Sequence, residues 1–192
     1  MAQVKLKGEK ILSDEHYTLK KVSFYIQKKD GSWQQQEREV YDHGNAVTVL
    51  LYNKSERKVI LVSQFRIASY LNGNESGMLI EACAGLLKKN EDPKNAMIRE
   101  IEEETGYVVS DIEKIYEAFS SAGAYTEKIY YYIGAYDQSQ KKGKGGGLED
   151  EQEELQVMEL PFDEAMNMIQ NGEIKDAKTI MLLQYAKLKG LL

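Results

Sequence analysis

The stretch that decides the fold is GLLKKNEDPKNAMIREIEEETGY, residues 85–107. Asp92 followed by Pro93 predicts the start of a helix, with Asp as the N-cap and Pro at the first helical position. The helix is predicted to run through Glu104, and Gly106 is placed to end it. One helix therefore forms the centre of this stretch.

Three glutamates share one face of the predicted helix. At about 100° per residue, with Glu100 set at 0°, Glu104 falls at about 40° and Glu103 at about −60°. Glu102 falls at about 200°, points away from the others and is expected to be solvated. Like charges at this spacing, at the C-terminal end of a helix, are unfavourable. A hard divalent cation bound to carboxylate oxygens would offset both costs.

A solvated acidic helix face is the alternative explanation of these glutamates, because it is the usual meaning of a run of like charges. The fixed offsets of Gly85, Glu91, Arg99 and Gly106 around the glutamates favour a functional site instead. Arg99 lies four residues before Glu103, so we expect its guanidinium to hold that carboxylate in orientation.

The flanking sequence predicts strands around this helix. A hairpin is expected at Asp30-Gly31, between the runs 19–26 and 33–41, because an Asp-Gly pair favours a tight β-turn. Further strands are predicted at 46–52, 59–65, 78–82, 112–119, 128–136 and 155–160, loops at 72–77 and 138–148, and helices at 163–170 and from Asp176 towards 188. Strands interrupted by one central helix, with helices at the end, predict an α/β sandwich on a mixed sheet.

Composition excludes several classes of protein. The chain has 192 residues, 42% of them apolar, and a formal net charge of −6, which gives no support to nucleic-acid binding. No apolar run approaches the roughly 20 residues that span a bilayer. Cys83 is the only cysteine, and the start has no signal-like run, so we expect a cytoplasmic location. One cysteine and two histidines are too few for a zinc site of the usual kind.

Residues 85–107 resemble the Nudix box, G-x5-E-x7-R-E-U-x-E-E-x-G-U, where U is a bulky aliphatic residue. Every fixed position matches except the last, where Tyr107 replaces the aliphatic residue. The chain as a whole resembles the GDP-mannose pyrophosphatase branch of this superfamily, which lies near the ADP-ribose pyrophosphatases. The other segments that carry this resemblance are 11–14, 38–42, 64–66, 72–77, 81–87, 126–127 and 145–151.

The resemblance implies a Nudix-type α/β/α sandwich with a mixed β-sheet, preceded by an N-terminal antiparallel β-sheet region. The domains would be an N-terminal β region at 1–43, exchanged between the subunits of a homodimer, and a Nudix hydrolase domain at 44–192. The implied activity is Mg²⁺-dependent cleavage of GDP-mannose to GMP and mannose 1-phosphate, with Mn²⁺ as a substitute metal. No nucleic acid or membrane partner is expected.

Two alternatives remain open at this point. One is an ADP-ribose or other ADP-sugar pyrophosphatase, and the other is a non-catalytic Nudix-fold binding module. Ser121-Ala122-Gly123 stands where GDP-mannose and ADP-ribose pyrophosphatases commonly have Ser-Pro-Gly. Since that loop lies near the substrate in the family, Ala122 leaves the base and the sugar open.

The resemblance also assigns roles at the metal site. Glu100, Glu104 and the backbone carbonyl of Ala84 would be metal ligands, and Glu103 would be a further ligand or a base that orients water. Glu151 would approach the metals as ligand or base when substrate is bound. Arg99 completes the implied catalytic set.

Further residues are expected to contact substrate. Gly85, lacking a Cβ, would let the chain pass close to metal and phosphate, unless it is a plain turn glycine. Arg66 would bind the diphosphate through two hydrogen bonds, unless it forms a surface salt bridge. The other implied contacts are His16 (or neighbouring Tyr17), Glu37, Arg38, Glu39, Leu86, Glu127, Asp150 and Lys178, and for Lys178 solvation at a helix start is an equal alternative.

Overall fold

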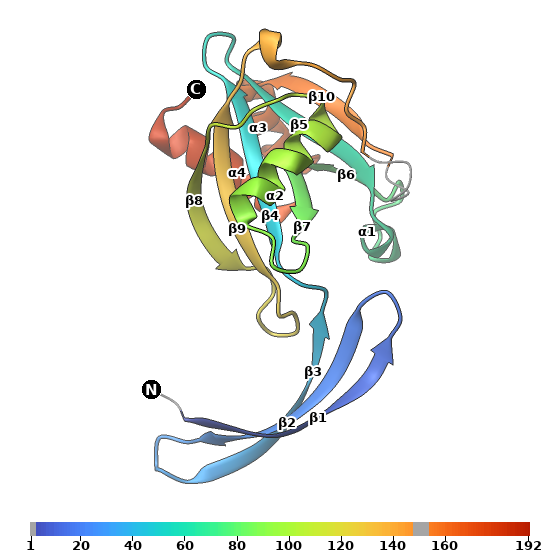
Figure 1. Cartoon of the computed structure of the whole chain (residues 1–192), viewed down its shortest axis with the longest axis vertical. Helices are drawn as coiled ribbons and strands as arrows, with labels where there is room; N and C mark the ends of the chain where they lie inside the picture. The colour runs from blue at the N-terminus through green and yellow to red at the C-terminus, as the bar shows by residue number, and fades with distance from the viewer. Residues whose placement is uncertain (1–2, 148–153) are drawn as a thin grey trace. The chain divides into compact units, whose positions relative to one another are not determined.

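The computed structural model describes residues 3–147 and 154–192, and the chain divides into two compact units (Figure 1). The N-terminal unit comprises Met1–Asn45 and Ala118–Ile129, and the main unit comprises Ala46–Glu117 and Tyr130–Leu192. Among the described residues, no helix has the length and apolar character needed to cross a membrane.

The N-terminal unit contains a three-stranded antiparallel sheet in the order β1 (Val4–Asp14), β2 (Thr18–Gln27) and β3 (Trp33–Asp42). The predicted hairpin is confirmed, since Asp30 accepts a hydrogen bond from the Ser32 N–H at 2.9 Å and Gly31 has a φ of 84°. β1 was not predicted from sequence. All of its residues are exposed, so its sequence carries no pattern of a buried face.

A seven-stranded sheet forms the centre of the main unit. Its strands follow the order β10-β5-β4-β9-β8, with β6 paired to β5 and β7 paired to β4. The bounds are β4 Ala46–Asn53, β5 Lys58–Phe65, β6 Met78–Glu81, β7 Cys83–Leu86, β8 Ile112–Phe119, β9 Lys128–Ala135 and β10 Gln156–Pro161. The predicted strands of the main unit are therefore confirmed to within a few residues.

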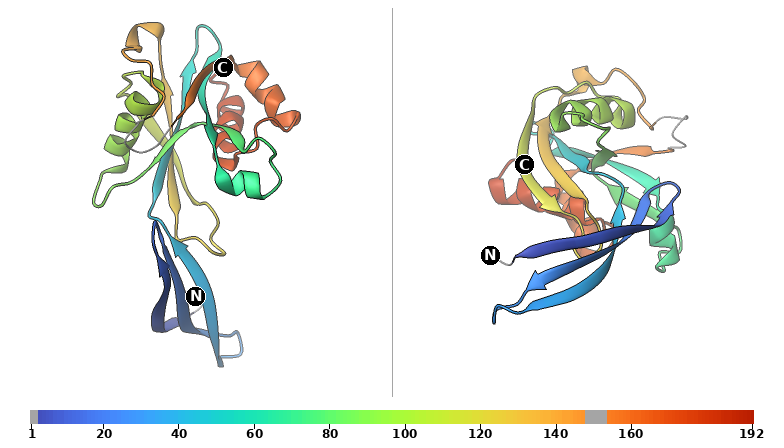
Figure 2. Two further views of the ribbon diagram at one scale, coloured as in Figure 1. Left: turned by 90° about the vertical axis from the view of Figure 1, so that its right-hand side faces the viewer. Right: turned by 60° about the horizontal axis from the view of Figure 1, so that its bottom comes forward.

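Helices cover both faces of this sheet. α2 (Pro93–Glu100) lies on one face, and α3 (Phe162–Gln170) and α4 (Ala177–Lys189) lie on the other (Figures 1 and 2). The predicted α/β sandwich is therefore confirmed. Met97 and Ile101, from the helix and its continuation, pack against strand residues such as Val49 in a buried core.

Two short elements of the main unit were not predicted. α1 (Ile67–Leu71) has no buried residue and no side-chain cap, so neither signal of a helix is present in its sequence. β7 is short and contains Ala84 and Gly85, which have low strand propensity. It forms because its backbone pairs with β4, a contact that its own sequence does not encode.

The predicted helix changes geometry before it ends. α2 stops at Glu100, and Ile101–Thr105 continue as a π-helical turn, η1, that ends at Gly106 with a φ of 74°. The Thr105 hydroxyl donates to the Ile101 carbonyl at 2.5 Å. The predicted helix through Glu104, ended by Gly106, is confirmed, but its last turn is π-helical, so the assumed 100° per residue does not apply there.

Tyr107, which departs from the Nudix pattern, is accommodated in the core. Its side chain is buried, and its ring meets that of Tyr136 edge-on at 5.0 Å between centroids. Its hydroxyl donates to Gln138 at 3.2 Å, and the Tyr136 hydroxyl donates to Glu159 at 2.7 Å. The extra polar atom of a tyrosine therefore has a partner at this packing position.

Removal of the N-cap of α2 tests how the helix is held. The Asp92 carboxylate accepts hydrogen bonds from the N–H groups of Lys94 and Asn95 at 3.0 and 3.1 Å. We expect Asp92→Ala to lower the free energy of unfolding by about 1 kcal/mol in urea titrations. Asp163→Ala, which removes an exposed acid that caps no helix, should cost less than about 0.5 kcal/mol. Equal losses in the two variants would contradict the capping role.

Candidate active site

The site is built where β7 passes the end of α2. A Cβ added to Gly85 would lie 2.1 Å from both Cδ and Oε1 of Glu100. Glu100 is buried, so its carboxylate fills the space that a side chain at position 85 would need. Gly85 is therefore a strand residue whose missing side chain makes room for an acid, and the plain turn glycine considered from sequence is wrong.

Glu104 is the second buried acid of the site. Its Oε2 accepts a hydrogen bond from the Ala84 N–H at 3.2 Å. Ala84 thus contacts this acid through its N–H, and the role of metal ligand that the resemblance gave to its carbonyl stays a prediction. Glu103 is half-buried, and Glu102 is exposed, as its position on the predicted helix indicated. Glu100 and Glu104 consequently both face β7.

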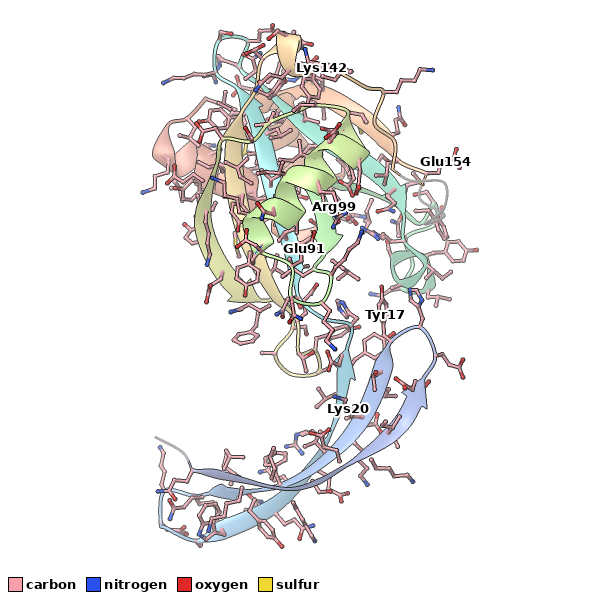
Figure 3. All side chains as sticks on the ribbon, in the orientation of Figure 1. Tyr17, Lys20, Glu91, Arg99, Lys142 and Glu154 are labelled. Atoms are coloured by element: carbon pink, nitrogen blue, oxygen red, sulfur yellow. The ribbon has the colours of Figure 1, made fainter. Side chains whose placement is uncertain are left out.

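Arg99 forms ion pairs with three acids. Its guanidinium nitrogens lie 3.2 Å from Glu91, 2.9 Å from Glu100 and 2.7 Å from Glu103. Figure 3 labels Arg99 and Glu91 side by side at α2. Burial alone would lower the pKa of Arg99, but the three carboxylates outweigh it, so the pKa lies above its ordinary value. The sequence-based expectation that Arg99 orients Glu103 agrees with this geometry.

Glu91 gains a second anchor from the loop before the helix. Its Oε2 accepts a hydrogen bond from the Lys88 N–H at 2.9 Å. That bond and the Arg99 guanidinium lower the pKa of the Glu91 carboxyl. A charged Glu91, held by the Lys88 N–H, therefore helps to fix Arg99.

Arg66 is paired with an acid that sequence reasoning missed. Nε and Nη2 of Arg66 donate to the two oxygens of Glu81 at 3.0 and 2.8 Å. The Glu81 side chain is only 4% exposed, whereas that of Arg66 is 43% exposed. Burial tends to lower the pKa of Arg66, but the Glu81 carboxylate outweighs this effect, so the pKa of Arg66 is raised. The available signal was a single charged residue within the apolar strand 78–82.

Lys178 is engaged at the start of α4. Its amino group lies 2.6 Å from the carboxylate of Asp176, which caps the helix by accepting from the Thr179 N–H at 2.9 Å. The Thr179 hydroxyl accepts a hydrogen bond from the Ala82 N–H at 2.6 Å. This chain of bonds links the start of α4 to the strand region that carries Glu81.

The donor set fits a hard cation but does not enclose one. In residues 3–147 and 154–192, no three side chains of His, Cys, Asp or Glu are grouped closely enough to hold a metal ion. Glu100 and Glu104 nevertheless offer buried carboxylates on one side of the helix end. Mg²⁺ usually takes one or two carboxylates, with water and substrate phosphates completing its shell. Glu100 and Glu104 match that demand.

Leu86, another expected contact, is exposed at the end of β7 in the main unit. The remaining expected residues lie in the N-terminal unit or outside the described ranges. Glu37 pairs with Lys21 at 2.6 Å, and Arg38 donates to Gln36 at 3.0 Å, so both are engaged within the sheet. Glu39 is exposed. Asp150 and Glu151 lie outside the residues that the structure describes.

An aromatic cluster in the N-terminal unit includes two of the expected positions. His16 and Tyr17 contact each other at 4.3 Å between ring centroids, and Tyr17 lies 5.1 Å from His43. His43 in turn lies 3.9 Å from the carboxylate of Glu127. Tyr41 and Tyr125 complete the cluster. Sequence analysis did not anticipate that these rings meet.

Two family models match consecutive parts of the chain. The model described as the GDP-mannose pyrophosphatase NudK N-terminal domain matches residues 3–41. The NUDIX domain matches residues 42–183, which is more than half of the chain. The chain therefore belongs to the Nudix family of hydrolases.

Relatives are similar over the full length. GDP-mannose pyrophosphatases of Escherichia coli O1:K1 / APEC and of Shigella flexneri are each 46% identical over 190 residues, which cover 99% of this chain and 98% of the relative. A solved structure described as an ADP compounds hydrolase matches with a TM-score of 0.72 and covers 99% of this chain and 97% of its own. At 16% identity, this structure shows the fold alone.

Gly85→Ala tests whether the acid pocket sets the rate of catalysis. The new methyl group would displace the Glu100 carboxylate, and a misplacement of about 1 Å can cost on the order of 100-fold in rate. We expect kcat to fall by that order while thermal unfolding changes little, because the displaced group is the end of a flexible side chain. Gly143→Ala, where a Cβ meets its nearest atom at 3.7 Å, is the control. Retention of wild-type kcat by Gly85→Ala would contradict the arrangement.

Proposed function

We propose that the chain hydrolyses the diphosphate bond of GDP-mannose, in the presence of Mg²⁺, to give GMP and mannose 1-phosphate. The observation that carries this proposal is the pair of buried carboxylates, Glu100 and Glu104, at the helix end beside Gly85. The substrate is inferred from relatives 46% identical over 99% of the chain, whose name states that activity. The relatives' names do not specify the metal, and Mg²⁺ is chosen for its preference for carboxylate and phosphate oxygen.

Each residue of the site has a proposed task. Glu100 and Glu104 would hold the metal, together with the Ala84 carbonyl and Glu151. The bound cation would supply positive charge against the diphosphate and activate water for attack. Glu103 or Glu151 would accept the proton of the attacking water, and Arg99 would orient Glu103. The 2.7 Å contact with Arg99 supports Glu103 as this base, because the contact fixes the direction of the Glu103 carboxylate.

Substrate binding would use groups from several elements. Arg66, 43% exposed and already held by Glu81, would contact the diphosphate and stabilise the departing phosphate. Gly85 and Leu86 would lie beside the phosphates. The proposed contacts with base, sugar and phosphate are His16, Glu37, Arg38, Glu39, Glu127, Asp150 and Lys178. No covalent enzyme intermediate is required in this scheme.

An ADP-ribose or other ADP-sugar pyrophosphatase is the second candidate. This candidate stays open because Ala122 departs from the Ser-Pro-Gly loop common to both groups of enzymes, whereas Ser121 and Gly123 match both. A panel of nucleotide sugars, assayed with Mg²⁺ and with a chelator, separates the candidates. We expect kcat/KM for GDP-mannose to be at least that for ADP-ribose. Preference for ADP-ribose would favour the second candidate, and no Mg²⁺-dependent release from any member would favour a non-catalytic module.

Glu104→Gln tests the metal role of the buried acid. The amide keeps the size of the side chain and an oxygen that can accept from the Ala84 N–H, but it removes the charge. We expect turnover to be nearly abolished at saturating Mg²⁺, with a circular dichroism spectrum like that of wild type. Exposed Glu102→Gln is the matched control and should retain activity. Wild-type rates from Glu104→Gln would refute the mechanism.

We also propose a homodimer in which the N-terminal region, residues 1–43, is exchanged and reaches the partner's site. A three-stranded sheet needs a covered apolar face for independent stability. Throughout the described strands β1, β2 and β3, no residue is buried. Leu6 and Ile11 are 71% and 58% exposed. A second copy of the chain would supply the missing cover. We place this dimer in the cytoplasm, which fits a chain with one cysteine.

The oligomeric state tests this assembly. Light scattering coupled to gel filtration should give twice the chain mass of 21.9 kDa. The double variant Leu6→Lys, Ile11→Lys should shift the mass towards the monomer, because charges on a covered face lose solvation. Leu188→Lys, at a position 83% exposed near the C-terminus, should leave the mass unchanged. A monomeric wild type at micromolar concentration would contradict the proposal.

A further inference from the structure

The glycine-rich segment of the main unit closes the end of the helix that carries the glutamates. The last carbonyl groups of a helix have no partner inside it and must find donors elsewhere. Here the Gly146 N–H donates to the Glu104 carbonyl at 2.8 Å, and the Gly147 N–H donates to the Glu103 carbonyl at 3.2 Å. The backbones of both glutamates are therefore held by this segment.

A third carbonyl, two residues beyond Glu104, is held in the same way. The Gly106 carbonyl accepts from the N–H groups of Lys142 and Gly143 at 2.8 and 3.0 Å. Lys142, which belongs to this segment, is labelled near the top of Figure 3. Donors from residues 142–147 thus satisfy the carbonyls of Glu103, Glu104 and Gly106 at the end of the helix.

The close approach requires glycine at one position above all. Gly145 has a φ of 66°, and a Cβ there would lie 2.4 Å from the Glu104 carbonyl oxygen and 2.5 Å from the Thr105 carbonyl carbon. Both atoms belong to the backbone, which cannot rotate away as a side chain can. The φ of 109° at position 146 also favours glycine. A Cβ there would meet its nearest atom at 3.5 Å, so the steric demand is weaker than at Gly145.

The segment is itself anchored on its far side. The Leu155 N–H donates to the Gly146 carbonyl at 3.0 Å, and the Leu155 side chain is buried. Gly146 is therefore tied to the core through Leu155 and to the catalytic helix through Glu104. A position bonded on both sides can transmit the rigidity of the core to the glutamate backbone.

We propose that the backbone of residues 145–147 is a positioning element for the Glu103 and Glu104 carboxylates. The inference rests on the proposed function, since it assigns a role in that reaction. Fixing the two carbonyls fixes the π-helical turn, and the turn sets the direction in which both side chains leave the backbone. The glycine N–H groups also offset the negative end of the helix dipole, where two further acids are otherwise unfavourable.

Three glycine variants test the proposal. In Gly145→Ala the methyl group must push the Glu104 carbonyl away, so we expect kcat for GDP-mannose to fall at least about 10-fold, with KM within about twofold. Gly146→Ala should cause a smaller fall and serves if Gly145→Ala does not fold. Gly143→Ala is the matched control, because its Cβ would meet ordinary contacts at 3.7 Å and no positive φ is required.

The readouts separate positioning from stability. If the glycine were purely structural, its replacement would lower the melting temperature and leave kcat per folded molecule unchanged. That result in Gly145→Ala, or in Gly146→Ala if Gly145→Ala does not fold, would overturn the proposal. Affinity for Mn²⁺ alone, measured by calorimetry, is the second readout and should be weaker in the same variant than in Gly143→Ala.

Failure of the proposed function is distinguishable from failure of this inference. If the wild type cleaves no nucleotide sugar, the proposed function fails and Mn²⁺ affinity decides. Weaker Mn²⁺ binding in Gly145→Ala would then still support positioning of the acids, and affinity equal to that of Gly143→Ala would overturn it.

Discussion

The ion-pair network around Arg99 is the interaction on which the site depends. One guanidinium faces Glu91, Glu100 and Glu103, so the four groups carry a formal net charge of −2 when all are ionised. Burying an acid is costly unless it is paired. Arg99 meets part of that cost, and the remaining negative charge, increased by Glu104, is what a divalent cation would neutralise. The network therefore both holds the acids and leaves them attractive to metal.

Backbone geometry delivers the acids to this network. β7 supplies a glycine that makes room for Glu100 and an amide that binds Glu104. The π-helical turn supplies carbonyls that the glycine-rich segment satisfies. Each of these contacts is between main-chain atoms or between main chain and carboxylate, so side-chain variation elsewhere in the unit can leave the site intact.

Arg66 and Glu81 form a second pair with a different balance. The acid is buried and the guanidinium is half-exposed. The pair has no net charge when both groups are ionised, but its exposed side carries the positive group. A guanidinium held in this way would lose less side-chain freedom on contact with a phosphate, which supports the contact proposed for it. The salt bridge considered from sequence as an alternative is therefore present, but it leaves the arginine partly exposed.

Local patterns predicted most of the main unit. The Asp-Pro start of α2, the Gly106 end, the apolar runs of β4 and β5 and the Asp176 cap all mark boundaries with residues of strong preference. The spacing of Glu100, Glu103 and Glu104 identified the acids, and Arg99 was identified through its distance from Glu103. Each of these signals lies within a few neighbouring residues, so it can be seen in the sequence without knowledge of the fold.

Contacts between distant segments could not be predicted from local pattern. Carbonyls of the π-helical turn accept hydrogen bonds from glycines some 40 residues later, and β7 pairs with β4. Glu81 lies in an ordinary strand pattern, and only its distance to Arg66 shows its role. β1 carries no buried face, so its periodicity gives no signal. In each case the deciding partner is remote in the chain.

A crystal structure with Mg²⁺ and a non-hydrolysable GDP-mannose analogue tests the central claim most directly, namely that Glu100 and Glu104 form a metal site beside the diphosphate. The account predicts Mg²⁺ at about 2.0–2.1 Å from an oxygen of each carboxylate, with phosphate oxygens in the same shell. Arg66 should contact the diphosphate while still paired with Glu81. Mg²⁺ bound elsewhere, with Glu100 and Glu104 contacting only protein donors, would contradict the account.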